Sequence, residues 1–256
     1  MNPVVLRIAQ DLAREMAAEG AAATVLMGSH VRGEAHGESD IDLTFIGRDE
    51  DGWLERRAGH LVSAYWRKAE TVLAGFDTPA VAGGLVPAWR QALAVHDPQG
   101  VALSLKRQAE SWQWSAIEET CDRWVAQEIA SYAEEVHRLV GCLRTGNLLM
   151  AAVVRSVLAM RLATVLSVHL RLFYETENRL WDLVGRTMGE RWTLVQARAL
   201  GSGGEPFQAT CAAALELYTV AAAHTTHLMD QTQSRVVAHA CALAAQQLDQ
   251  RPGAER

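Results

Sequence analysis

Apolar residues recur at helical spacing near the start of the chain. Val5, Ile8 and Leu12 share one face of a helix, which predicts a helix over residues 4–18 that ends at Gly20. Its polar residues lie on the opposite face. The chain therefore begins with an amphipathic helix that needs a sheet or another helix to cover it.

The residues that follow carry short apolar runs of strand length, separated by polar and glycine-rich segments. The predicted strands cover residues 24–27, 40–46, 61–65, 91–96 and 101–105. Asp97-Pro98-Gln99-Gly100, between the last two, is typical of a hairpin turn, because proline fixes φ and glycine can adopt a positive φ. The charged run over residues 48–52 predicts a solvated turn between the second and third strands.

Beyond residue 110 almost the whole pattern is helical. The predicted helices cover residues 115–143, 147–175, 180–188, 192–200, 206–227 and a last segment that ends near residue 248. The sequence thus predicts an α+β fold. We expect a mixed β-sheet flanked by helices over residues 1–110, an α-helical bundle over residues 111–250 and a polar tail over residues 251–256.

Composition narrows the class of partner. The chain has 256 residues, of which 49% are hydrophobic and 21% are charged, and a formal net charge of −6. That charge argues against a nucleic-acid partner, which usually meets a dense basic face. We expect a cytoplasmic protein with no membrane contact, since no secretory signal and no uninterrupted apolar run of about 18 residues occur. Four scattered cysteines without a Cys-x-x-Cys pair are interpreted as core thiols.

The first candidate for chemistry is a glycine-serine pair that follows the strand over residues 24–27. Gly28 has no Cβ, so the backbone of Gly28 and Ser29 can approach phosphate oxygens closely. A short helix beginning near Val31 would add a favourable partial charge toward a polyphosphate. This segment predicts a nucleotide-binding turn.

The second candidate is a pair of carboxylates at the start of the strand over residues 40–46. Side chains alternate across a sheet, so Asp40 and Asp42 fall on one face, with Ile41 and Leu43 on the other. Two neighbouring carboxylates repel each other unless a cation lies between them. Mg²⁺ suits this position because it takes a few carboxylates and completes its octahedron with water and substrate phosphates.

Together these residues resemble the signature of the nucleotidyltransferase superfamily of the DNA polymerase β type. That signature is Gly-Ser, a spacer of about ten residues and then Asp-hydrophobic-Asp-hydrophobic, and Arg32 and Ser39 within the spacer strengthen the match. Two further segments are similar to the kanamycin group of aminoglycoside nucleotidyltransferases. They are residues 97–103 and residues 128–133.

The resemblance implies a Mg²⁺-dependent enzyme that transfers a nucleoside monophosphate, such as AMP from ATP, to a hydroxyl of a small molecule and releases pyrophosphate. Asp40 and Asp42 would hold Mg²⁺, while Gly28, Ser29 and Ser39 would lie around the triphosphate. Arg32 would neutralise charge there, or would instead pair with Glu34 or Glu38 on the surface. An aminoglycoside would be one acceptor. The relatives also imply a homodimer, with residues 148–172 and 211–223 as interface or as bundle core.

Two departures from the family pattern leave the chemistry open. Ser63 stands where the family has a third carboxylate, and Ser131 stands where the kanamycin enzyme has its general base. Glu128, Glu134 and Glu135 lie within a helical turn of Ser131 and are the candidates for the catalytic base.

Two alternatives stay open. The departures favour a degenerate member that binds nucleotide or a small molecule without turnover. The other is an antitoxin-like enzyme that modifies a partner protein, which the chain length disfavours.

Overall fold

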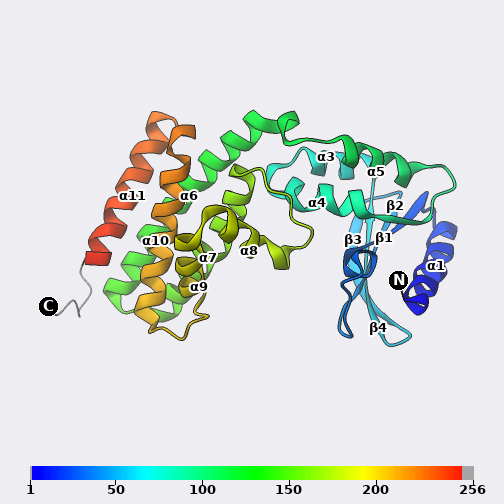
Figure 1. The fold of residues 1–256 in the computed structure, drawn as a ribbon, viewed down its shortest axis with the longest axis horizontal. Coiled ribbons are helices and arrows are strands. Elements are labelled where there is room, and N and C mark those ends of the chain that lie inside the picture. Colours follow the sequence, from blue (N-terminus) through cyan, green and yellow to red (C-terminus); the bar gives the residue numbers. More distant parts are fainter. Residues whose placement is uncertain (1, 250–256) are drawn as a thin grey trace. The chain divides into compact units, whose positions relative to one another are not determined.

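The structure, a computed structural model, describes residues 2–249, which form two compact units (Figure 1). The first unit contains residues up to Ala116 together with residues 173–176, and the second contains residues 117–172 and those from Glu177 onward. The predicted α+β fold class is confirmed: a mixed sheet with helices precedes a long helical region. The first unit continues past the expected boundary at residue 110, because the helix that begins at Val101 runs to Ser111.

The first unit is built around a five-stranded sheet in the order β3-β4-β2-β1-β5. Its strands are β1 (Ala23–Met27), β2 (Ile41–Ile46), β3 (Glu50–Arg57), β4 (His60–Arg67) and β5 (Leu93–His96). β2 pairs in parallel with β4, while the other three pairings are antiparallel. The three inner strands β4, β2 and β1 are therefore hydrogen-bonded on both sides.

Helix α1 (Pro3–Ala18) covers one face of this sheet, as its apolar spacing predicts. Leu12 on the helix and Leu43 and Phe45 on β2 are almost completely buried in the same core cluster. The Asn2 side chain accepts a hydrogen bond from the Val4 N–H and so caps the start of the helix. The face of β2 that carries Asp42 is turned away from this core.

The prediction of a strand over residues 101–105 is wrong. These residues begin helix α5 (Val101–Ser111), and the predicted hairpin turn is its cap. Gly100 has φ of 72°, and the Asp97 carboxylate accepts hydrogen bonds from the N–H groups of Ala102 and Leu103. The short apolar run fits a helix as well as a strand, and the cap selects the helix.

Three further elements of the first unit were not predicted. They are strand β3 and the helices α3 (Ala69–Phe76) and α4 (Pro79–Gln91). β3 is an edge strand with exposed charged residues in place of an apolar run, and it begins at Glu50, within the predicted turn over residues 48–52. α4 contains glycines and Pro87, which weaken a helical pattern.

The second unit is helical throughout. After the short η1 (Trp114–Ile117), its elements are α6 (Glu118–Thr145), α7 (Leu148–His169), α8 (Glu177–Met188), α9 (Glu190–Leu200), α10 (Phe207–Thr225), η2 (Thr226–Leu228) and α11 (Gln231–Asp249). Helices α6, α10 and α11 pack side by side in this unit (Figure 1). All four cysteines are free thiols, and three of them are buried in the helices.

Helix α7 is shorter than the predicted span of residues 147–175. It ends at His169, and Arg171 then takes a left-handed backbone conformation with φ of 55°. By length and composition alone α7 is apolar enough to cross a membrane, with a mean hydropathy of 1.8 over a window that is 39% buried. Buried core helices meet the same criteria.

Candidate functional site

The sheet register places Met27, Asp42 and Ser63 next to one another on neighbouring strands. Met27 pairs with Asp42 across β1 and β2, and Asp42 pairs with Ser63 across β2 and β4. Ile41 and Leu43, on either side of Asp42, point into the core that α1 covers. The Asp42 carboxylate therefore lies on the sheet face opposite to α1.

Gly28 lies in direct contact with Asp42. It opens the short helix α2 (Gly28–Arg32) with φ of 74°. A Cβ at this position would lie 1.9 Å from Asp42 Oδ2, so no other residue fits without a shift. The predicted start of this helix near Val31 is wrong, because Gly28 and Ser29 belong to its first turn.

The Asp42 carboxyl is electrostatically unfavourable in its ionised form. Burial raises the pKa of Asp42 to about 6, the charge of Asp40 adds to the increase, and the charge of Arg32 opposes it. Asp40 and Arg32 are thus both close enough to act on the charge of Asp42. A proton or a cation at Asp42 would relieve the unfavourable energy.

Arg32 is held by its own neighbours. Its Nε donates to Glu34 at 2.9 Å, and its Nη1 donates to the backbone oxygen of Glu175 at 3.2 Å. Only 11% of the Arg32 side chain is exposed. Of the two surface partners expected for Arg32, the structure shows Glu34, and the charge of Arg32 also lowers the pKa of Asp42. Its contact with a triphosphate stays a prediction.

Ser39 organises the loop that leads to the carboxylates. Its Oγ accepts a hydrogen bond from the His36 N–H at 3.0 Å, and its own N–H donates to the His36 oxygen. This turn directly precedes Asp40. The geometry gives Ser39 a structural role, in addition to the nucleotide contact that the resemblance implies.

His30 is a member of this site that the sequence analysis did not single out. It is buried, and its Nε2 has no hydrogen-bond partner among the described residues. Burial lowers the pKa of His30, and a hydrogen bond with the Ser39 backbone opposes that decrease. In the sequence, only its place between Ser29 and Arg32 pointed to a role in the site. Its burial depends on tertiary packing, which the sequence of so short a helix does not show.

The side chains at this site fit a metal ion that the protein binds only in part. Among residues 2–249 no group of three or more His, Cys, Asp or Glu side chains is placed to hold a metal ion. Asp40 and Asp42 are two carboxylates, and Ser63 occupies the neighbouring place on β4. Two carboxylates suit a Mg²⁺ ion that takes its other ligands from substrate phosphates and water, and they do not form a closed protein cage.

The candidates for a catalytic base lie on α6 in the second unit. Both carboxylate oxygens of Glu135 accept hydrogen bonds from Arg138, which also binds Glu134. Burial raises the pKa of the Tyr132 phenol, and the charge of Glu128 raises it further. Of the three, Glu128 is the carboxylate that no described arginine or lysine pairs within 4.0 Å.

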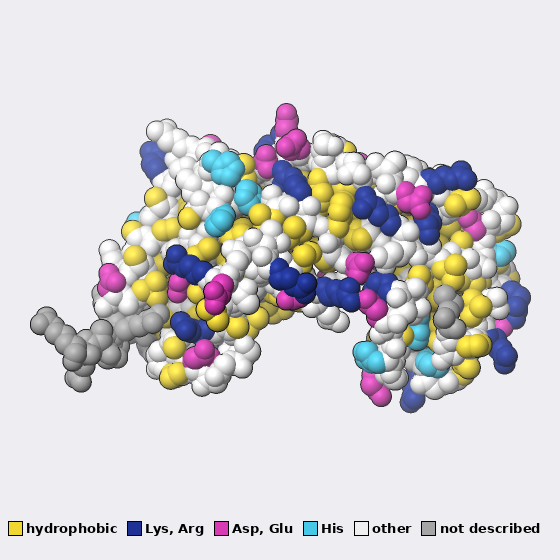
Figure 2. Space-filling view, viewed as in Figure 1, with side chains coloured by type: hydrophobic (Ala, Val, Ile, Leu, Met, Phe, Trp, Pro, Cys, Tyr) yellow, Lys and Arg dark blue, Asp and Glu magenta, His cyan; other side chains and the backbone are white. Residues whose placement is uncertain are grey.

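Charged groups of both signs are mixed on one face of the molecule. On the face drawn in Figure 2, Lys and Arg side chains stand among Asp and Glu side chains on both units. Such mixing differs from the continuous basic stripe of proteins that bind duplex nucleic acid.

Comparisons with known proteins place the fold in a class. No family model matches the sequence, and no curated protein matches it. Ten chains of solved structures match, among them a nucleotidyltransferase-like protein from Exiguobacterium sibiricum. That match has a TM-score of 0.51 and 13% identity, and it covers 95% of this chain and 78% of the other. The chain therefore has a nucleotidyltransferase-like fold.

Proposed function

We propose that the protein is a nucleotidyltransferase that transfers a nucleoside monophosphate, AMP from ATP in the simplest case, to a hydroxyl of a small molecule. One observation carries the proposal: Gly28 lies directly against the Asp42 carboxylate, whose pKa is raised to about 6 beside Asp40. The sequence resemblance of residues 28–42 to the nucleotidyltransferase signature and the similarity of fold support it.

Several residues of the first unit would bind the nucleotide, each in a different way. Asp40 and Asp42 would hold Mg²⁺, which neutralises charge on the phosphates when it is bound. Gly28 lets the chain approach the carboxylate, and the first turn of α2 offers backbone N–H groups that have no partner within the helix. Arg32 supplies a fixed positive charge at the same place.

The proposed step is a displacement at the α-phosphorus. The acceptor hydroxyl oxygen forms a bond to this phosphorus, and the bond from the phosphorus to the oxygen that bridges to the β-phosphate breaks, so pyrophosphate leaves. A base takes the hydroxyl proton. We propose Glu128 for this base ahead of Glu134 and Glu135, since Arg138 binds the latter two.

A binding protein without turnover is the second candidate. The observation that favours it is the register between β2 and β4, which puts the neutral Ser63 beside Asp42. A site with two carboxylates in place of three neutralises one metal ion less completely. The same experiment separates the two candidates.

The test is pyrophosphate release with Mg²⁺ and each of ATP, GTP, CTP and UTP against a panel of hydroxylated acceptors. We expect release with at least one pair of substrates, and loss of at least 100-fold in Asp42→Asn because the metal would lose a charged ligand. Asp51→Asn, which removes an exposed carboxylate from β3, is the matched control and should retain activity.

Two results would contradict the proposal. Full activity of Asp42→Asn would remove that residue from the chemistry. Binding of nucleotide without release of pyrophosphate from any pair would favour the binding protein.

A further inference from the structure

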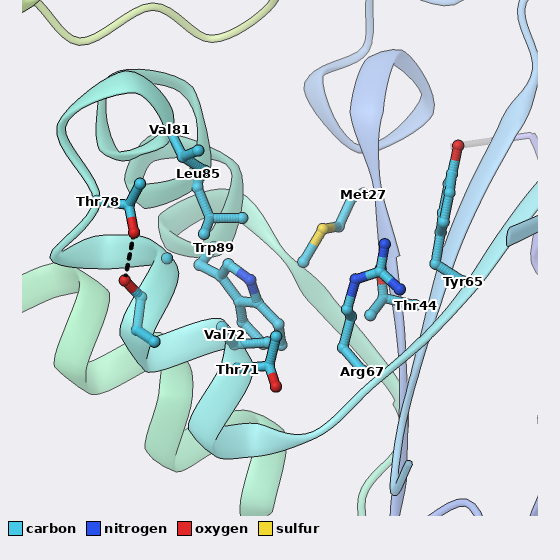
Figure 3. Close-up of a pocket in the computed structure, with 12 residues that line it drawn as sticks. Met27, Thr44, Tyr65, Arg67, Thr71, Val72, Thr78, Val81, Leu85 and Trp89 are labelled. Atoms are coloured by element: carbon cyan, nitrogen blue, oxygen red, sulfur yellow. Dashed lines mark hydrogen bonds between the residues drawn. The ribbon is translucent and has the colours of Figure 1, made fainter. Parts of the chain in front are cut away.

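A pocket of about 520 Å³ opens in the first unit, between the sheet and helices α3 and α4 (Figure 3). Thr44, Tyr65 and Arg67 line it from the strands, and Val72 and Trp89 line it from the helices. Its volume falls in the range of sites that take small organic molecules.

The pocket is adjacent to Asp42 on the same face of the sheet. Thr44 is two residues beyond Asp42 on β2, so the two side chains point the same way about 7 Å apart. Met27, which pairs with Asp42 across β1 and β2, is also part of the pocket wall. A molecule held here could place a hydroxyl near the carboxylates.

The lining combines apolar side chains with one cation. Met27, Val72, Leu85 and Trp89 are among its apolar residues, and none of the described lining residues is acidic. Arg67 is the one charged residue among them. The pocket therefore matches an apolar or aromatic body that carries a negative charge.

The Arg67 guanidinium is fixed but not neutralised. Its Nη1 donates to the backbone oxygens of Glu50 at 2.9 Å and Trp66 at 2.7 Å, which leaves Nε and Nη2 without an acceptor among the described residues. No described carboxylate lies within 4.0 Å of its nitrogens. Asp49, the carboxyl whose pKa Arg67 helps to lower, is held mainly by Lys68 N–H and by the Thr71 hydroxyl.

We propose that this pocket binds the acceptor, and that the acceptor has an apolar or aromatic body with a carboxylate or another oxyanion bound by Nε and Nη2 of Arg67. An arginine edge with two N–H donors is the group that binds such anions in two places. A polycation such as an aminoglycoside would put its charge beside Arg67 with no acidic lining residue to balance it. The role as acceptor site rests on the proposed function, whereas the binding of the anion does not.

Binding is tested first, with two aromatic probes that differ in charge. The anionic probe is 8-anilinonaphthalene-1-sulfonate, and the neutral probe is N-phenyl-1-naphthylamine, which has the same rings without the sulfonate. Arg67→Met removes the charge and keeps an apolar stem, and Arg56→Met removes an exposed arginine from β3 as the control. Folding of each variant is checked by its thermal unfolding.

We expect Arg67→Met to weaken binding of the anionic probe about 10-fold or more, because a charge-assisted hydrogen bond is lost. Binding of the neutral probe should change by less than about 2-fold in that variant, and Arg56→Met should leave both probes unchanged. Equal affinity of the anionic probe for the native protein and Arg67→Met would overturn the proposal. So would an equal loss for both probes.

The acceptor role is tested by competition and turnover. ATP alone should not displace the anionic probe, and competitive displacement would show that the pocket takes the nucleotide instead. Hydroxylated aromatic acids should support pyrophosphate release better than their neutral amides, with Arg67→Met abolishing the difference.

These outcomes separate the two proposals. Release with an aminoglycoside that is unaffected by Arg67→Met would overturn this inference and leave the nucleotidyltransferase function in place. Probe binding that depends on Arg67, without release from any acceptor, would support the anion site and contradict the function. Asp42→Asn should bind both probes as the native protein does.

Discussion

Asp42 illustrates how a single buried carboxyl opposes stability. Its side chain is partly buried, and burial together with the charge of Asp40 raises its pKa from 3.8 to about 6. A shift of this size corresponds to about 3 kcal/mol between the protonated and ionised forms. Above pH 6 the folded protein carries that cost, and below pH 4 the carboxyl is protonated in both the folded and the unfolded chain.

We therefore expect Asp42→Asn to raise the free energy of unfolding by about 1 to 3 kcal/mol at pH 7.5, because the amide removes the buried charge. The gain should shrink as the pH falls from 6 toward 4. Urea unfolding at pH 5, 6 and 7.5 measures it, with Asp51→Asn as the exposed control. A variant less stable than the native protein at pH 7.5 would show that Asp42 is stabilised by its surroundings.

Gly28 and Gly33 form a matched pair that separates backbone strain from close approach. Their φ angles are 74° and 75°, but a Cβ at Gly28 would meet Asp42 at 1.9 Å, and one at Gly33 would meet nothing within 4 Å. Alanine at either position costs about 1 to 2 kcal/mol from the left-handed backbone. We expect Gly28→Ala to lose additional stability and the proposed transfer activity, and Gly33→Ala to lose only the stability that the left-handed backbone costs. Equal unfolding midpoints would contradict the contact.

At the scale of elements, a cap decides the conformation of an ambiguous segment. Asp97 accepts hydrogen bonds from the N–H groups of Ala102 and Leu103 at 3.2 and 2.9 Å. Asp97→Ala should lower the free energy of unfolding by about 1 kcal/mol, since two N–H groups at the start of α5 lose their acceptor. Asp97→Asn should retain part of this stability. Chemical unfolding of both variants is the measurement, and an unchanged midpoint in Asp97→Ala would remove the cap.

We expect the end of α7 to make the second unit sensitive to acid. Burial lowers the pKa of His169, His227, Arg171 and His224 lower it further, and Asp122 opposes the decrease. Because the unfolded chain binds a proton more readily than the folded one, stability should fall as the pH drops below about 6.5. His169→Gln should reduce the loss of thermal stability between pH 7.5 and 5.5. An unchanged slope would assign the acid sensitivity to other groups.

At the scale of the whole molecule, α7 carries an exposed apolar stripe. Leu149 is 80% exposed, and Val153 and Met160 are each 49% exposed at helical spacing along it. Residues 211–223, the other proposed interface segment, are mostly buried within α10. We therefore propose that the protein forms a homodimer through the stripe on α7.

Leu149→Glu tests this proposal by placing a charge in the stripe. Sedimentation velocity should show a dimer for the native chain and a monomer for the variant, because burial of an unpaired carboxylate opposes association. Leu54→Glu, at an exposed leucine on β3, is the control and should remain dimeric. A monomeric native chain would contradict the homodimer.

The sequence predicted those elements whose local pattern of apolar residues suits one conformation. This holds for the helical period of α1, for the apolar runs of β1 and β2 and for the helical pattern after residue 110. The fold class followed from the order of these elements. β3 was not predicted because an edge strand buries few side chains and needs no apolar run. The start of α5 was predicted as a strand because residues 101–105 are mostly apolar, and so short an apolar run suits a strand or a helix. The hydrogen bonds to Asp97 select the helix.

The same division holds for the candidate site. The sequence by itself determined that Gly28, Asp40 and Asp42 would belong to one short segment, since a turn and an alternating strand bring them together within fifteen residues. The place of Ser63 beside Asp42 was implied by the family resemblance, and the register of β2 and β4 shows it. Only the tertiary structure decided that His30 is buried and that Arg67 faces an apolar pocket. Those positions depend on strand order and helix packing, which join residues far apart in the chain, and no local pattern of side chains specifies such pairings.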